Sequence, residues 1–187
     1  MPDDTLSILT VCTGNVCRSP AVERLLANKL GPTVTVASAG THALVGHPIS
    51  EPMAALLAGY GIEERPFEAR RLSEQMLKEA DLILPLTRAQ RSLVVDLWPA
   101  AVRRSFTLRE FARLLGWVDR SALPAGTPGD RLRTAIPLAA AERGRERTSA
   151  DEDDVIDPFR LSDEVYADSF AQISSAVAAI VGVLAPS

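Results

Sequence analysis

The feature that most constrains this chain is an apolar run that passes through a tight turn into a helix near the N-terminus. Leu6–Cys12 is rich in β-forming residues, and the turn formers at 13–15 follow it directly. Ser19 and Pro20 then precede apolar residues at helical spacing, so we expect Ser19 to be the N-cap of a helix over 20–30. A strand that leads into a helix in this way is the first half of a parallel crossover unit.

The rest of the chain continues this alternation of strands and helices. The pattern predicts further strands at 34–37, 81–87 and 103–108, and helices at 50–60, 73–80, 88–97, 108–117, 131–143 and 163–184. Loops are expected at 40–48 and 121–130, and a charged connection at 144–154. We therefore expect an α/β fold over 1–187 as a single domain, with three layers (α/β/α) and a central parallel sheet of about four strands.

Composition excludes several classes of function. Hydrophobic residues make up 47% and charged residues 24%, as in globular domains, and the net charge of −4 argues against a nucleic-acid partner. The N-terminus is acidic where a secretory signal is basic, and the apolar stretch at 173–185 is too short and too interrupted to span a membrane. We expect a cytoplasmic protein with no nucleic-acid and no membrane partner.

The only two cysteines, Cys12 and Cys17, are too few for a disulfide framework. Together with His42 and His47 they do not have the spacing of a zinc finger or ribbon, so we expect no metal site and no cofactor.

The segment between the first strand and the first helix carries the chemistry. It lies where open α/β sheets bind ligands, and its backbone N–H groups and the helix dipole together favour an anion. Arg18 adds a planar fork of donors that matches phosphate oxygens, and the same field favours the thiolate form of Cys12. The candidate phosphate-binding residues are Thr13, Gly14, Asn15, Val16, Cys17, Arg18 and Ser19. A thiolate aimed into such a site fits attack on phosphorus through a cysteinyl-phosphate intermediate. The alternative is a buried cysteine beside an ordinary strand–helix turn.

At this point the sequence resembles the low-molecular-weight protein tyrosine phosphatases, whose signature is a first strand followed by Cys-x5-Arg-Ser-Pro, here residues 11–20. The resemblance continues through Ser38-Ala39-Gly40-Thr41, Gly46-His47-Pro48, Ala69-Arg70-Arg71-Leu72, residues 80–84 and Asp157-Pro158-Phe159. It implies the phosphotyrosine phosphatase I-like fold. The segment 95–148 is longer than the corresponding segment of the family, so we expect it to contain an insertion.

The resemblance also implies roles for individual residues. Cys12 and Arg18 would be catalytic, and Asp157, in the chain's only Asp-Pro pair, would be the general acid. Where the family usually has a tyrosine after this pair, the chain has Phe159 and Arg160, so we expect these two residues and Leu44, or His42 in its place, to wall the substrate pocket. The expected partners are a phosphotyrosine-containing protein or a small aryl phosphate, and inorganic phosphate.

Two further hypotheses concern neighbouring residues. Cys17 lies in the same loop as Cys12, and the resemblance implies that it can pair with an oxidised nucleophile; a small buried side chain is the alternative. The carboxylates at 151–154 either form a solvated run or keep Asp157 protonated by like-charge repulsion.

Three other functions stay open. An arsenate reductase of the same fold resembles this loop but relies on further cysteines, and the chain has none beyond Cys12 and Cys17. A non-catalytic phosphate- or phosphoprotein-binding module would not need Asp157. A two-cysteine redox protein would more typically have Cys-x-x-Cys.

Overall fold

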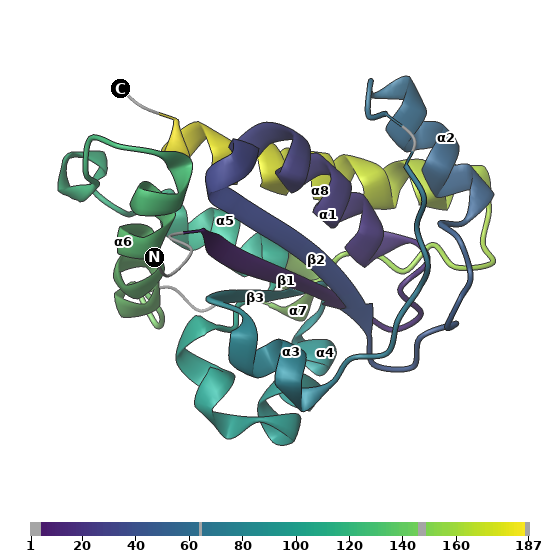
Figure 1. Cartoon of the computed structure of the whole chain (residues 1–187), viewed down its shortest axis with the longest axis horizontal. Coiled ribbons are helices and arrows are strands. Elements are labelled where there is room, and N and C mark those ends of the chain that lie inside the picture. The colour runs from purple at the N-terminus through teal and green to yellow at the C-terminus, as the bar shows by residue number, and fades with distance from the viewer. Residues whose placement is uncertain (1–4, 64, 146–148, 186–187) are drawn as a thin grey trace.

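The computed structural model describes residues 5–63, 65–145 and 149–185 (Figure 1). The strands are β1 (Leu6–Cys12), β2 (Val34–Gly40) and β3 (Leu82–Pro85). The α-helices are α1 (Arg18–Leu30), α2 (Glu51–Gly59), α3 (Glu74–Glu79), α4 (Arg88–Leu97), α5 (Leu108–Leu115), α6 (Pro128–Ala141), α7 (Ala150–Asp153) and α8 (Asp163–Leu184). Three short 3₁₀ helices are η1 (Gly31–Thr33), η2 (Pro99–Arg104) and η3 (Arg120–Ala122).

The sheet is parallel, with the strand order β2-β1-β3. The central strand β1 pairs in register with β2 from Leu6 opposite Val34 to Cys12 opposite Gly40. Because β1 is central, the loop that leaves its carboxyl end has a neighbouring strand end on each side. The expected α/β fold with a parallel sheet is confirmed.

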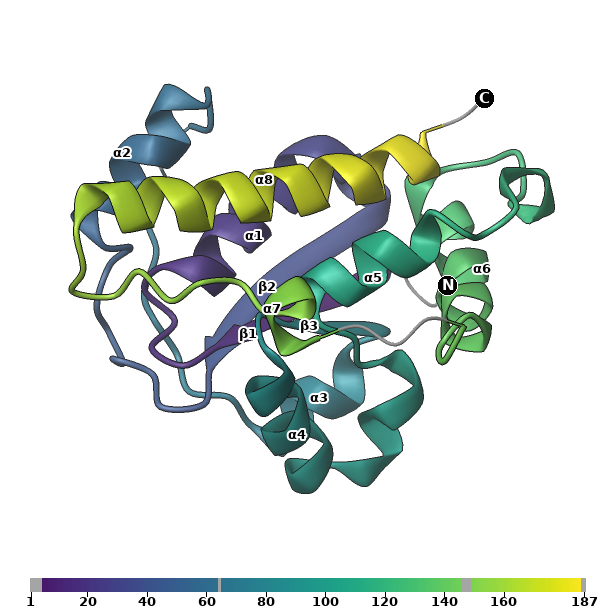
Figure 2. The ribbon, with the colours of Figure 1, turned by 180° about the vertical axis from the view of Figure 1, so that it is seen from behind.

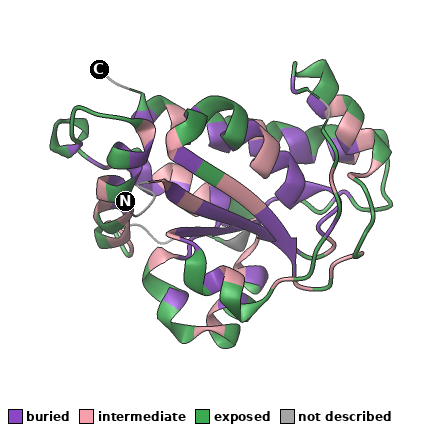
Figure 3. Ribbon diagram, in the orientation of Figure 1, coloured by how far each residue is buried: buried purple, intermediate pink, exposed green. Residues whose placement is uncertain are grey.

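Helices cover both faces of this sheet. In Figures 1 and 2, α1, α5 and α8 lie on one side, and α3 and α4 lie on the other. Alternate residues of β1 enter two separate clusters: Leu6 and Ile8 pack with the first group of helices, and Leu9 and Val11 with the second. β1 and β3 are accordingly buried along almost their whole length, whereas β2 at the edge of the sheet is exposed or partly exposed at 35–37 (Figure 3). The three-layer arrangement follows from this period-two burial.

The fourth strand expected at 103–108 is not formed, and this prediction was wrong. Pro99 begins η2, which continues to Arg104, and Thr107 is already the cap of α5, with a capping box to Glu110. Residues 105–107 remain between these helices, and Ser105 among them forms a single parallel bridge with Ile83. Two strong local helix signals therefore leave too few residues for a strand.

The segment predicted as an insertion, 95–148, contributes to the core in its described part. Phe106 and Phe111 are fully buried with ring centroids 5.1 Å apart, and Leu132 of α6 is buried in the same cluster. The loop predicted at 121–130 is shorter than expected, because η3 occupies part of it and α6 begins at Pro128 behind a capping box. The charged connection at 144–154 likewise contains the short helix α7.

Among the described residues, α8 is the helix with the length and apolar composition to cross a membrane. In this fold it packs along α1 and α5 and buries Phe170, Ile173, Val177 and Ile180 (Figure 2). This packing is that of a core helix.

Candidate active site

The loop at the carboxyl end of β1, residues 12–19 and hereafter the cysteine loop, leads directly into α1. The helix begins at Arg18 with Cys17 as its N-cap residue, so Ser19 is not the N-cap that the sequence predicted. No side chain caps this helix, and the hydroxyl of Ser19 in its first turn contacts Cys12 and Asn15. The first backbone N–H groups of α1 are thereby kept from a side-chain acceptor, as an anion site requires.

The thiol of Cys12 is buried at the start of this loop. Its sulfur lies 3.0 Å from Ser19 Oγ and accepts a hydrogen bond of 3.3 Å from the backbone N–H of Asn15. A thiolate at Cys12 would accept hydrogen bonds from both groups. The structure thus surrounds the sulfur with donors and with the end of a helix.

Asn15 holds the loop in shape from its centre. Its backbone is left-handed, with φ of 56°, a conformation that asparagine tolerates better than most residues. Its side-chain amide donates to Ser19 Oγ and Ser38 Oγ, each at 2.9 Å, and its oxygen accepts from the backbone N–H of Arg70 at 2.8 Å. Because Asn15 is fully buried with these bonds made, it ties the cysteine loop to β2 and to the segment at 69–72.

The outer side of the cysteine loop is bound by the segment that follows β2. Backbone N–H groups at 41, 42, 44 and 50 donate to the carbonyl oxygens of residues 12, 13, 14 and 16, at 2.8–3.0 Å. The carbonyl oxygens of the cysteine loop therefore accept hydrogen bonds from the segment that surrounds the loop. Gly40 makes the approach possible, because a Cβ there would lie 2.5 Å from the carbonyl oxygen of Thr13.

Arg18 and Asp157 are brought together although they lie in opposite halves of the chain. The Arg18 guanidinium is buried, donates 3.0 Å to the carbonyl oxygen of Val155, and forms an ion pair of 2.6 Å with Asp157. The Asp157 side chain is 51% exposed, and its other carboxylate oxygen accepts a bond from the backbone N–H of Phe159. Asp157 therefore sits at the mouth of the site, between solvent and the arginine.

A pocket of about 130 Å³ joins these groups. Its lining consists of Cys12, Thr13, Gly14, Val16, Cys17, Arg18, His42, Leu44, Asp157 and Phe159. The predicted nucleophile, arginine, acid and apolar walls thus share one cavity, and both Leu44 and His42 face it. Arg160, which was also predicted for the pocket, is not in this lining; its guanidinium stacks over the Phe159 ring at 5.0 Å.

Cys17 is a buried residue of the cysteine loop. Its sulfur lies 3.1 Å from Ser50 Oγ and 3.5 Å from the Tyr166 hydroxyl. Burial raises the pKa of the Cys17 thiol, and the hydrogen bonds with Ser50 and Tyr166 offset only part of this effect. Burial likewise raises the pKa of Tyr166.

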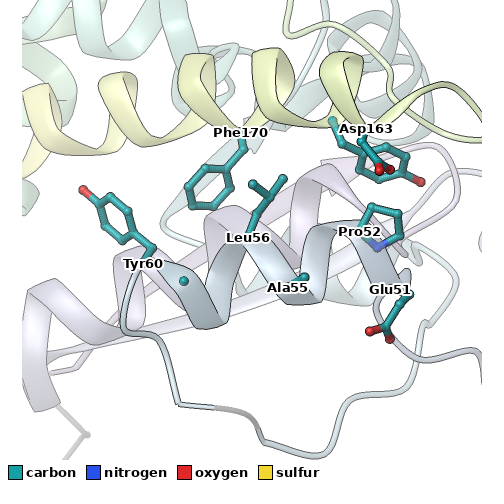
Figure 4. A pocket seen from close by; sticks show the side chains of 9 residues that line it. Glu51, Pro52, Ala55, Leu56, Tyr60, Asp163 and Phe170 are labelled. Atoms are coloured by element: carbon teal, nitrogen blue, oxygen red, sulfur yellow. The ribbon is translucent and has the colours of Figure 1, made fainter.

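Tyr166 also borders a second, larger groove of about 640 Å³ between α2 and α8 (Figure 4). Its walls are mostly apolar, with Leu56 and Phe170 at the centre, Tyr60 near one end and the carboxylates of Glu51 and Asp163 near the other (Figure 4). None of the groups predicted to react lines this groove, so the chemistry belongs to the smaller pocket at Cys12.

The acidic run before Asp157 is largely engaged by neighbouring groups. Asp153 is buried and paired with Arg88 and Arg113, and Asp154 accepts a bond of 2.7 Å from the backbone N–H of Arg88. The hydrogen bond with Asp153 raises the pKa of Arg88. Two arginines thus offset the charge of Asp153, which was expected either to be solvated or to act on Asp157 by repulsion.

The sequence did not point to several residues that shape the site. Ser38 and Arg70 hold Asn15, and Ser50 and Tyr166 contact Cys17. Gln90, buried at the start of α4, donates to Thr13 Oγ1 and accepts from the backbone N–H of Leu86. The first two lie in motifs that carry the family resemblance, but the contacts of Ser50, Tyr166 and Gln90 have no local signal.

Within residues 5–63, 65–145 and 149–185, no three His, Cys, Asp or Glu side chains are grouped closely enough to hold a metal ion. His42 lies at the pocket wall, while His47 is exposed.

Comparison with known proteins places this site in a family. A family model described as low molecular weight phosphotyrosine protein phosphatase matches residues 7–117. The low molecular weight protein-tyrosine-phosphatase Ptp of Acinetobacter johnsonii is 37% identical over 102 residues, which are 54% of this chain and 71% of that protein. A protein-arginine-phosphatase of Geobacillus stearothermophilus is 39% identical over 132 residues, which are 68% of this chain and 84% of that protein.

Solved structures agree with these sequence matches. The YwlE arginine phosphatase from Geobacillus stearothermophilus superposes with a TM-score of 0.70 and 26% identity, over 95% of this chain and 91% of that one. A low molecular weight protein tyrosine phosphatase from T. tengcongensis superposes with a TM-score of 0.69 and 26% identity, over 95% and 99%. Since the family model covers more than half of the sequence and the fold extends over nearly all of it, the chain belongs to the low molecular weight phosphotyrosine protein phosphatase family.

Proposed function

We propose that this chain is a cysteine-dependent phosphomonoesterase whose substrates are phosphotyrosine in proteins and small aryl phosphates. One observation carries the proposal: Cys12, Arg18 and Asp157 line a single small pocket at the carboxyl end of β1. Leu44 and Phe159 give this pocket apolar walls on which an aromatic leaving group can rest. Family membership supplies the reaction class.

In the proposed first step the Cys12 thiolate attacks phosphorus, and the bond between phosphorus and the leaving oxygen breaks. Arg18 has five N–H donors, so its contacts with Val155 and Asp157 leave donors for the phosphoryl oxygens, which the loop N–H groups also bind. Asp157 gives its proton to the leaving oxygen. In the second step the Asp157 carboxylate takes a proton from water, whose oxygen attacks phosphorus and releases inorganic phosphate and Cys12.

The other functions considered from sequence fit less well. An arsenate reductase of this fold relies on further cysteines, and this chain has only Cys12 and Cys17. A binding module needs no acid beside the arginine, whereas Asp157 lies 2.6 Å from Arg18. A two-cysteine redox protein would more typically have Cys-x-x-Cys, whereas four residues separate Cys12 from Cys17.

Phosphoarginine is the second candidate substrate. The protein-arginine-phosphatase of Geobacillus stearothermophilus matches a larger share of this chain than the Ptp phosphatase does, 68% against 54%. The leaving group of phosphoarginine is a guanidinium nitrogen. This nitrogen also needs a proton, which Asp157 can provide.

A substrate panel tests the choice between these two. We expect phosphotyrosine peptides to give kcat/KM at least about tenfold above phosphoarginine peptides of the same flanking sequence, because apolar walls favour an aromatic ring over a guanidinium. Phosphate release is measured for both, with phosphoserine peptides as the control. A preference for phosphoarginine would contradict the first proposal and support the second.

We further propose that Cys17 protects Cys12 during oxidation. Peroxide converts the Cys12 thiolate to a sulfenic acid, and the Cys17 thiolate then attacks that sulfur and expels hydroxide, leaving a disulfide. Because burial raises the pKa of Cys17, a larger fraction becomes thiolate as the pH rises, so disulfide formation should be faster at alkaline than at neutral pH.

Mass spectrometry of the peroxide-treated protein should find the Cys12–Cys17 disulfide, and dithiothreitol should restore activity. Cys17→Ser should instead lose activity irreversibly through over-oxidation of Cys12. A wild-type sample in which the disulfide never forms, while Cys12 becomes over-oxidised, would contradict this role.

Cytoplasmic localisation is part of the proposal, as is the absence of a membrane or nucleic-acid partner. The net charge of −4 and the packing of α8 against α1 and α5 support it.

A further inference from the structure

The segment that leads to Asp157 is held by charged side chains of two other helices. The side chain of Asp153 is 6% exposed. One of its carboxylate oxygens forms an ion pair of 2.6 Å with Arg88 of α4, and the other forms an ion pair of 3.1 Å with Arg113 of α5. The carbonyl oxygen of Asp153 accepts a bond of 2.8 Å from the hydroxyl of Thr107. A third arginine, Arg109, donates to the carbonyl oxygens of Asp151 and Asp154 at 2.8 Å each.

The residues between Asp153 and Asp157 are held equally closely. The backbone N–H of Val155 donates a hydrogen bond of 2.8 Å to the carbonyl oxygen of Leu86, just after β3. The carbonyl oxygen of Val155 accepts a hydrogen bond from Arg18. Ile156 is tied to α8, because its N–H donates to Gln172 and its carbonyl accepts from Ser169. The backbone is therefore fixed from α7 to within one residue of Asp157.

Asp157 itself has far less support. Its side chain is half-exposed, and its contacts are the ion pair with Arg18 and one bond from the backbone N–H of Phe159. A proton donor must lie within hydrogen-bond reach of the leaving atom, and a shift of about 1 Å can cost about a hundredfold in rate. The position of this carboxylate must come from the segment before it.

We propose that Asp153 is a positioning residue for Asp157: clamped between Arg88 and Arg113, its buried carboxylate fixes the backbone from which Asp157 reaches the pocket. This inference rests on the proposed function, in which Asp157 is the general acid. The clamp joins α4, α5 and α7, elements that contribute no side chain to the lining of the Cys12 pocket.

The test uses aryl phosphates that differ in the acidity of the leaving phenol, with kcat/KM as the readout because it includes cleavage of the phosphorus–oxygen bond. Asp153→Asn should lower kcat/KM for phenyl phosphate by about 10- to 100-fold, and for dinitrophenyl phosphate, which needs little protonation, by less than about threefold. Inhibition by inorganic phosphate, which reports on the cysteine loop, should be unchanged. Asp96→Asn, an exposed aspartate in the last turn of α4, is the matched control and should match wild type with both substrates.

A double-mutant cycle separates positioning from a general structural role. In the Asp157→Asn background, Asp153→Asn should cause no further loss, because there is no acid left to position. An equal loss for both leaving groups, or a further loss in that background, would overturn the inference. If Asp153→Asn does not fold, Arg88→Gln removes one arm of the clamp, and the same pattern with a smaller loss is expected.

The same data distinguish this failure from failure of the proposed function. If the loss of kcat/KM caused by Asp157→Asn is the same for all leaving groups, Asp157 is not the acid and both proposals fail. If the loss depends on the leaving group for Asp157→Asn but not for Asp153→Asn, only the positioning role of Asp153 is contradicted.

Discussion

Replacement of Cys12 by serine should reduce hydrolysis of para-nitrophenyl phosphate by about 10⁴- to 10⁶-fold, the scale on which the loss of a nucleophile acts in other covalent enzymes. Serine is nearly isosteric and can keep the contacts with Ser19 and with the Asn15 N–H. Its hydroxyl, however, is hardly ionised near neutral pH, and no base of the described site lies beside it, whereas a thiol in this field ionises readily. Steady-state rates without added metal measure the effect.

Two controls make this result specific to the nucleophile. Circular dichroism and thermal unfolding should match wild type, because the substitution leaves the packing around β1 nearly unchanged. An acid-quenched reaction of wild type should carry a phosphoryl group on the peptide that contains Cys12. Activity of Cys12→Ser within about tenfold of wild type would remove Cys12 from the reaction.

Asp157→Asn should have the second largest effect, a loss of about 10²- to 10⁴-fold in kcat/KM for phenyl phosphate, because the leaving phenolate then departs without a proton. The amide keeps the size of the side chain, and its one oxygen can still accept from either Arg18 or the Phe159 N–H, which bond to different oxygens of the Asp157 carboxylate. The loss should therefore reflect the missing proton rather than a rearranged loop. It should shrink as the leaving phenol becomes more acidic.

The measurement is the slope of log kcat/KM against the acidity of the leaving group. The slope should be steeper for Asp157→Asn than for wild type, while inhibition by inorganic phosphate stays within about a few-fold. Asp96→Asn again serves as the control. A uniform loss across all leaving groups would assign Asp157 to substrate binding through Arg18 instead of to proton transfer.

Elements with strong local signals could be located from sequence alone. The limits predicted for β1, for the helix at 88–97 and for the helix at 163–184 coincide with β1, α4 and α8. The helix predicted at 73–80 corresponds to α3, whose N-cap Ser73 accepts from the N–H of Met76. Each of these features depends on hydrogen bonds and periodicity among residues close in the sequence.

Predictions failed where two local signals competed or where a side chain had a distant partner. Apolar residues at 103–108 favoured a strand, but η2 and the capping box of α5 occupy most of that stretch. Ser19 has the sequence context of an N-cap, yet its hydroxyl is used by Cys12 and Asn15. At 103–108 two local helix signals leave too few residues for a strand, and at Ser19 hydrogen bonds within the cysteine loop replace a weak capping preference.

That a cysteine, an arginine and a run of backbone N–H groups share one loop can be read from the sequence, because all of them lie within eight consecutive residues at the end of β1. The position of the acid, in contrast, depends on how distant segments pack in the folded chain. Asp157 reaches Arg18 because the segment before it is tied to α4, α5, β3 and α8 by contacts such as Arg88–Asp153 and Val155–Leu86. The partners in such contacts are far apart in the sequence, so their pairing depends on how the helices pack on the sheet and leaves no pattern in either segment alone.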